Sequence, residues 1–202
     1  MDIGSNIGDL TLAGACVVGR EGKVYSFEPH TRTYRFLAAN IALNECLNVV
    51  AFNLALGDKQ SEMLLVDLGR SDDQNRVSEE GRGMPVKMAR LDDLLPSESW
   101  IQLLKIDVEG YEKFVLEGAS RTLEKTSCVY FESSEGHFKR YGYNCGDVIT
   151  ILENKGFKVF RLVGEDSLAP CGVNCSSETL ENLIAVRQTE EFLTRTQFHL
   201  TA

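Results

Sequence analysis

The chain has 202 residues, of which 43% are hydrophobic and 25% charged, a composition typical of a globular domain. Its formal net charge of −9 disfavours a nucleic-acid partner, because an acidic surface repels phosphate. No apolar run approaches the roughly 18 residues of a membrane span, and the first residues lack the features of a signal peptide. We therefore expect a cytoplasmic protein without a membrane partner, and one domain that covers residues 1–202.

Short β-like runs alternate with helical runs at the start of the chain. Residues 9–19 and 31–44 carry small or apolar side chains at helical spacing and predict helices. Residues 22–29 and 48–57 predict strands, because they are short, rich in apolar residues and closed by turn residues. Such alternation indicates a parallel α/β sheet with helices on both faces.

The pattern changes after residue 57 and then returns. Residues 61–68 and 84–91 predict two extended segments around a polar connection, which gives an extra hairpin near residues 62–91. The segments after it predict strands at 101–110, 127–134, 157–163 and 181–188, and helices at 111–125 and 146–156. The last two strands follow each other without a helix, which favours an antiparallel edge. We expect a mostly parallel sheet of about seven strands.

The chain opens with the stretch MDIGSNIGD, which suits a loop that approaches a ligand closely. Glu28 ends the second strand 20 residues after Gly8 and can accept hydrogen bonds from a ribose diol, as in dinucleotide sites. The glycines lack the G-x-G-x-x-G order that holds pyrophosphate. Asp2 instead suits an ammonium group, which points to S-adenosyl-L-methionine. A nicotinamide-dependent oxidoreductase remains an alternative, supported by Glu28 but not by the glycine order.

A second stretch, KIDVEGYEKFVLEGA at residues 105–119, concentrates ionisable residues where a strand gives way to a helix. Charge of this density at a sheet edge is costly to bury without a role. Together with DIGSNIG, SFEP, LAANIALN, LALGD and ARLDDLL, it resembles the FkbM-type S-adenosyl-L-methionine-dependent O-methyltransferases. The resemblance implies a Rossmann-like class I methyltransferase sheet and methyl transfer to a hydroxyl of a sugar or polyketide-like natural product.

The resemblance also implies which residues hold the cofactor. The opening loop would line the methionine part, Glu28 would hold the ribose, and residues 53–56 would flank the adenine. The full set of cofactor residues is Asp2, Gly4, Ser5, Asn6, Gly8, Glu28, Pro29, Asn53, Ala55, Leu56 and Asp107. Members of the family normally carry an apolar strand before the D-x-G motif, and here only Met1 precedes it, so we expect that the chain is shortened at its N-terminus.

Methyl transfer to oxygen needs a group that removes the acceptor proton. Asp107 is the first candidate for this base and Glu109 the second, while Lys105 could hold a carboxylate in place or orient the substrate. Asp107 could equally cap the following helix. His137 is a further candidate base, because its unperturbed pKa lies near 6.5, although it could also be a surface residue of a polar loop. Glu132, at the end of the preceding strand, could face the same acceptor.

The sequence leaves several alternatives open. Asp107, Glu109 and Glu132 could bind a hard cation, but we expect no metal, and we expect the loop thiols Cys171 and Cys175 to be reduced rather than zinc ligands. The segments 69–84 and 134–146 are the expected acceptor-facing parts, yet they carry no code for the acceptor. A non-catalytic binding module on the same fold is a further alternative. Neither the oligomeric state nor the methylated hydroxyl can be predicted.

Overall fold

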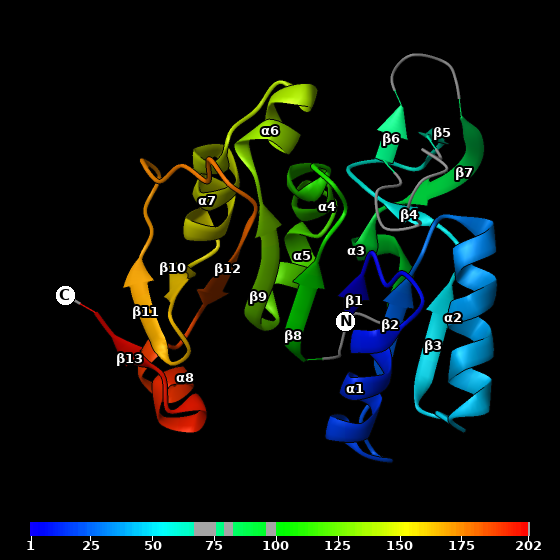
Figure 1. Cartoon of the computed structure of the whole chain (residues 1–202), viewed down its shortest axis with the longest axis horizontal. Coiled ribbons are helices and arrows are strands. Elements are labelled where there is room, and N and C mark those ends of the chain that lie inside the picture. Colours follow the sequence, from blue (N-terminus) through cyan, green and yellow to red (C-terminus); the bar gives the residue numbers. More distant parts are fainter. Residues whose placement is uncertain (67–75, 79–82, 96–99, 202) are drawn as a thin grey trace.

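The computed structural model describes residues 1–66, 76–78, 83–95 and 100–201, which form two β-sheets (Figure 1). The larger sheet has the strand order β3-β2-β1-β8-β9-β12-β10-β11-β13. Its strands are β1 (Asp2–Ile3), β2 (Val24–Phe27), β3 (Val49–Phe52), β8 (Ile101–Ile106), β9 (Thr126–Ser133), β10 (Lys158–Val163), β11 (Ser167–Pro170), β12 (Glu181–Val186) and β13 (His199–Leu200).

The large sheet is parallel from β3 to β9 and antiparallel from β9 to β11, while the short edge strand β13 is parallel to β11. Strand β12 lies between β9 and β10 and is antiparallel to both. This confirms the predicted, mostly parallel sheet with an antiparallel edge. Strands β11 and β13 extend that edge and were not predicted: β11 has four residues and β13 two, too few to show a period in the sequence.

The smaller sheet contains the predicted hairpin. Strands β5 (Ser61–Val66) and β7 (Met84–Ala89) pair antiparallel, and β6 (Arg76–Ser78) and β4 (Ala55–Leu56) add one strand on each side. Most of the expected acceptor-facing segment 69–84 lies outside the described residues. Figure 1 shows the small sheet above the carboxyl ends of β1, β2 and β3, at the same edge of the large sheet as α6.

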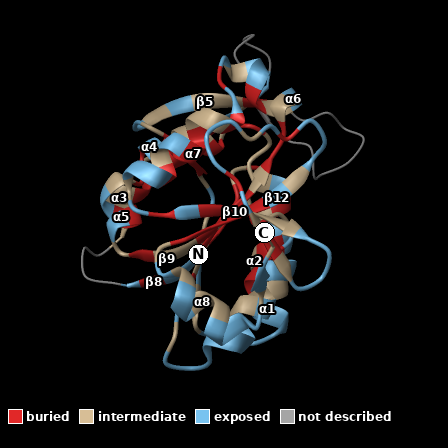
Figure 2. Ribbon diagram, turned by 90° about the vertical axis from the view of Figure 1, so that its left-hand side faces the viewer, coloured by how far each residue is buried: buried red, intermediate tan, exposed pale blue. Residues whose placement is uncertain are grey.

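Helices cover both faces of the large sheet, which explains why the strands are buried in the middle of the molecule (Figure 2). They are α1 (Asp9–Val18), α2 (Thr31–Leu43), α3 (Leu91–Leu94), α4 (Glu112–Glu117), α5 (Ser120–Glu124), α6 (Glu135–Phe138), the 3₁₀ helix η1 (Lys139–Tyr141), α7 (Cys145–Asn154) and α8 (Thr189–Thr196). None of the helices in the described parts of the chain is long and apolar enough to cross a membrane.

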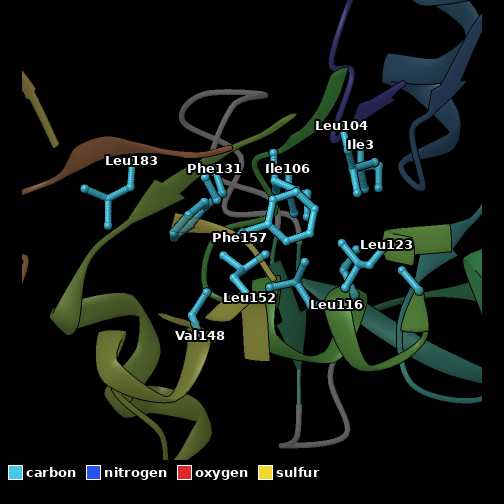
Figure 3. Packing of buried hydrophobic residues seen from close by; sticks show 14 of the residues in the cluster. Ile3, Leu104, Ile106, Leu116, Leu123, Phe131, Val148, Leu152, Phe157 and Leu183 are labelled. Carbon is cyan, nitrogen blue, oxygen red and sulfur yellow. The ribbon is translucent and has the colours of Figure 1, made fainter. Parts of the chain in front are cut away.

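One face of the sheet forms the main hydrophobic core. Its strands contribute every second residue, as the period of a strand requires, and α4, α5 and α7 contribute their apolar sides (Figure 3). The buried residues labelled there are Ile3, Leu104, Ile106, Leu116, Leu123, Phe131, Val148, Leu152, Phe157 and Leu183. The alternate residues of β1, β2 and β8 point to the face covered by α1, where Thr11 bonds Asp2 and lies 3.0 Å from Ser26. On this second face, polar side chains lie near the carboxyl ends of the strands.

Three segments differ in detail from the prediction. The helix expected at 111–125 is divided into α4 and α5, because the carboxylate of Asp92 accepts hydrogen bonds from the backbone N–H groups of Arg121 and Thr122 and so starts a second helix. The segment 134–146, for which no helix was predicted, contains α6 and η1, and the residues after the last predicted strand contain α8.

Neighbouring leucines of β8 provide a test of this core. Leu104 is fully buried, whereas Leu103 is 47% exposed. Leu104→Ala should lower the free energy of unfolding by about 2–5 kcal/mol, because it leaves a cavity under the sheet. Leu103→Ala, the matched control, should cost less than about 1 kcal/mol. Equal losses in urea denaturation of the two variants would contradict the assignment of the two faces of β8.

Candidate active site

The carboxyl ends of β1, β8 and β9 meet at one edge of the large sheet. In register, Asp2 pairs with Lys105 and Ile3 with Ile106, while Ile106 pairs with Phe131. The loop after β1, the loop after β8 and the last residues of β9 are therefore neighbours. Ligands of parallel α/β sheets bind at this edge.

Lys105 links the first of these loops to the second. Its ammonium group donates a hydrogen bond to the carbonyl of Gly4 at 2.7 Å and lies 3.2 Å from Asp2 Oδ1 and 3.5 Å from Asp107 Oδ2. The Lys105 side chain is only 9% exposed, so these contacts operate largely out of water. Of the two roles that we considered for Lys105, the contacts favour the holding of carboxylates.

Asp2 begins a buried polar network beneath the opening loop. Its Oδ2 accepts a 2.5 Å hydrogen bond from Thr11, and its backbone carbonyl accepts one from Ser5 Oγ at 2.7 Å. Ser5 Oγ in turn accepts hydrogen bonds from Ser26 Oγ and from the backbone N–H of Phe27. Both oxygens of the Asp2 carboxylate therefore have neighbours within the protein, and Asp2 determines the shape of the loop.

Gly4 brings the opening loop into contact with the loop after β8. Its φ is +74°, a conformation that favours glycine, and a Cβ at this position would lie 1.8 Å from the backbone carbonyl oxygen of Asp107. No side chain fits there. The D-x-G pattern of the sequence thus has a specific physical origin at this position.

Glu28 ties the opening loop to the loop after β2. Its Oε2 accepts a hydrogen bond from the backbone N–H of Asn6 at 3.0 Å, and its Oε1 accepts one from that of His30 at 2.8 Å. Burial raises the pKa of Glu28 to about 7. Asn53 supports the same loop, since its amide donates to the carbonyls of Glu28 and Pro29.

The turn after β8 is built around a buried glutamate. Glu112 has no exposed surface, and its Oε1 accepts hydrogen bonds from the backbone N–H groups of Val108 at 3.0 Å and Gly110 at 3.4 Å. Burial raises its pKa to about 7. The hydroxyl of Tyr143 donates to the Gly110 carbonyl at 2.6 Å and so helps to hold this turn. Within this turn Glu109 adopts a φ of 57°, which is uncommon for a residue other than glycine.

Glu109, Glu132 and His137 form an acid–histidine cluster beside this turn. Nδ1 of His137 lies 3.4 Å from Oε2 of Glu109 and 3.4 Å from Oε2 of Glu132. Burial, followed by the charges of Asp107, Glu109 and Glu112, raises the pKa of Glu132 to about 8. We expected no metal site, yet one ligand atom from each of these three residues lies within 4.8 Å of the others.

The structure brings most of the predicted residues to this edge, and two of them are buried. Ala55 and Leu56 lie in β4 and are 7% and 4% exposed, packed in the cores beneath the small and the large sheet. Glu132 was recognised in the sequence but not placed among the site residues. Its signal was its position at the end of a strand, which it shares with Glu28 and Asp107.

Comparison with known proteins is consistent with this geometry. The sequence profile of the methyltransferase FkbM domain matches residues 2–159. The chain is 28% identical over 138 residues to the hexuronic acid methyltransferase AglP of Haloferax volcanii. The aligned region covers 67% of this chain and 55% of that protein. It is also 28% identical over 186 residues to Methyltransferase 1 of Beauveria bassiana. This alignment covers 79% of this chain and 72% of that protein.

Two solved structures share the fold. One is a methyltransferase FkbM from Methylobacillus flagellatus, with a TM-score of 0.54 and 16% identity over 92% of this chain and 42% of that chain. The other is a putative rRNA methylase from Clostridium thermocellum, with a TM-score of 0.55 and 12% identity over 92% of this chain and 83% of that one. The chain thus spans about half the length of AglP and less than half of the FkbM structure.

The strand order, with β12 antiparallel between β9 and β10, and the glycine loop after β1 define a class I methyltransferase fold. Because the family profile covers more than half of its length, the chain belongs to the FkbM family of S-adenosyl-L-methionine-dependent methyltransferases. Membership implies S-adenosyl-L-methionine as the cofactor, as predicted, in place of a nicotinamide.

The buried Glu112 makes a prediction about pH. Because its pKa is about 7 in the folded chain and near 4.5 when exposed, the folded state binds its proton more tightly, and this stabilisation is lost as pH rises through 7. Between pH 5 and 8 the free energy of unfolding should fall by about 2–3 kcal/mol more in the parent chain than in Glu112→Gln. Glu117→Gln, an exposed glutamate of the same helix, is the control and should follow the parent. Parallel pH profiles for the parent and Glu112→Gln, from urea denaturation, would contradict the prediction.

Proposed function

We propose that this chain transfers a methyl group from S-adenosyl-L-methionine to a hydroxyl oxygen of a sugar, with Asp107 as the base. The observation that carries the proposal is the contact of Lys105 with both the Gly4 carbonyl and the Asp107 carboxylate. It holds a partly exposed carboxylate directly beside the loop that the family uses for its cofactor. This arrangement favours catalysis over a non-catalytic binding module, which has no need of a charged group at that point.

The residues present fit the cofactor. The backbone N–H groups of Gly4, Ser5, Asn6 and Gly8 donate hydrogen bonds within the protein and hold the loop at the edge of the sheet, where it can line the methionine part. Asp2 shapes the same loop through Thr11 and Lys105. Each oxygen of Glu28 accepts one backbone hydrogen bond and can accept another from a ribose hydroxyl. Asn53 keeps the neighbouring loop in position for the adenine.

When bound, S-adenosyl-L-methionine supplies a methyl group on a sulfonium, which an acceptor oxygen displaces by in-line attack. The residues of the chain have to orient the acceptor and take its proton. The Asp107 side chain is 43% exposed, so it is accessible to an acceptor, and Lys105 orients it. The proton that the hydroxyl loses goes to the Asp107 carboxylate and from there to water.

The sugar acceptor is supported by the name of one relative. AglP is a hexuronic acid methyltransferase by name. The acid–histidine cluster lies beside the turn after β8, at the end of β9, and offers oxygen and nitrogen acceptors for several hydroxyl groups. A polyketide-like acceptor would present more apolar surface, which this charged edge does not match.

The cofactor loop can be tested with two glycines of the same backbone conformation. Gly4 has a φ of +74° against the Asp107 carbonyl, whereas Gly164 has a φ of +72° and nothing within 4 Å. S-adenosylhomocysteine at 100 times its dissociation constant should stabilise the parent and Gly164→Ala by about 2.7 kcal/mol. Gly4→Ala should show no such stabilisation in thermal unfolding, and NADH should stabilise none of them. A full response of Gly4→Ala to S-adenosylhomocysteine would contradict this cofactor site.

The base can be tested by Asp107→Asn, which keeps the shape of the side chain and removes its proton-accepting charge. Methylated product from methyl glucoside and methyl glucuronide, measured by mass spectrometry, should fall by about 10²–10⁴-fold, with binding of S-adenosylhomocysteine unchanged. Asp93→Asn, another half-exposed aspartate with a cationic neighbour, should retain activity. Unchanged turnover of Asp107→Asn would exclude Asp107 as the base, and no product from either glycoside with the parent chain would contradict the sugar acceptor.

A further inference from the structure

The acid–histidine cluster has the spacing of a metal-binding site. Ligand atoms that bind one cation through bonds of about 2.0–2.2 Å are about 3.0–3.5 Å apart when they occupy neighbouring positions. His137 Nδ1 lies 3.4 Å from a carboxylate oxygen of each glutamate, and the three ligand atoms lie within 4.8 Å of one another. A cation can therefore contact all three after small side-chain movements.

The three side chains come from separate elements that the fold holds together. Glu132 lies in β9 opposite Asn182 of β12, and His137 lies on α6. Glu109 lies in the turn after β8, which touches α6 closely, since a Cβ added to Gly110 would be 2.9 Å from the His137 carbonyl oxygen. The backbone of each of the three residues is thus held by a neighbouring element, as a metal site with fixed geometry requires.

The charge around the cluster favours a cation. Oε2 of Glu132 is buried and accepts no hydrogen bond from any residue that the structure describes. Asp107 and Glu112 contribute two more carboxylates close to it. Lys105 is already engaged by Asp2 and Asp107. A buried carboxyl oxygen without a donor, in an excess of negative charge, is costly unless a proton or a cation joins it.

We propose that Glu109, Glu132 and His137 bind one divalent cation, and that this cation binds oxygen atoms of the acceptor. Two carboxylates and one imidazole suit a first-row ion such as Mn²⁺ or Zn²⁺, and three protein ligands leave coordination positions for another molecule. The acceptor part of the inference rests on the proposed function. It revises the expectation from the sequence that no metal is bound.

Such a cation would have two consequences for the acceptor. It lowers the pKa of a hydroxyl that binds to it, which eases loss of the proton to Asp107. It also compensates the charge of Glu109 and Glu132, which would otherwise repel an acidic sugar. The acceptors that it favours carry two adjacent oxygens, either a vicinal diol or a hydroxyl beside a carboxylate.

Direct titration with Mn²⁺ tests the metal site without reference to activity. Electron paramagnetic resonance of free Mn²⁺ should reveal one bound ion per chelator-treated chain. Glu132→Gln and His137→Gln should each weaken binding by about tenfold or more. Glu135→Gln is the control, because Glu135 is an acid on the same helix whose hydrogen bond from the Cys145 N–H a glutamine retains.

Circular dichroism of each variant, with its response to S-adenosylhomocysteine, establishes that it is folded. Absence of a bound ion in the parent chain, or equal affinity of all three variants, would overturn the metal site.

Methyl transfer then tests the role of the ion. Activity toward methyl glucuronide should be lost in EDTA and restored by Mn²⁺. Full activity in EDTA would overturn the inference while the proposed function stands. Tight Mn²⁺ binding that depends on Glu132 and His137, without methylated product from any glycoside, would support the metal site and count against the sugar acceptor alone.

Discussion

The geometry of the candidate active site, at the carboxyl ends of β1, β8 and β9, depends on one buried ammonium group. Lys105 reaches from β8 across to β1, where it meets the Asp2 carboxylate and the Gly4 carbonyl, and it also contacts Asp107. Without this positive charge, two carboxylates and a carbonyl oxygen would converge with nothing to hold them together. Because the two strands are adjacent and parallel, the same contact fixes the distance between the cofactor loop and the proposed base. The pairing of β1 with β8 and the contacts of the Lys105 ammonium group therefore hold the same two loops together.

The rest of the site carries more negative charge than Lys105 can balance. Glu28, Glu112 and Glu132 all have raised pKa values, for which burial is the largest cause in each case. Two of them, Glu28 and Glu112, accept hydrogen bonds from backbone N–H groups and so hold the loops around them in place. Oε2 of Glu132 has no such donor among the described residues, and this difference is why the cluster around it suits a cation.

Most of the fold could be predicted because its strands and helices differ in hydrophobic period. The site residues at strand ends, such as Glu28 and Asp107, could be predicted for the same reason, since the parallel order brings these ends together. Sequence alone could not show that Glu109 meets His137, because their contact depends on how closely the turn at Gly110 approaches α6. Nor could it show that Ala55 and Leu56 face the cores, since β4 is only two residues long and its partner β7 is remote in sequence.

The position of β12 also bears on how the chain could be divided. The FkbM profile ends at residue 159, at the start of β10, but β12 lies between β9 and β10. A chain ending there would keep only the first two residues of β10 and would lack β11, β12 and β13, so β9 would become an edge strand. Strand β9 would lose its partner on that side, including the residue opposite Glu132. The segment that matches the family profile therefore ends within the large sheet, and the residues after it supply the edge that covers β9.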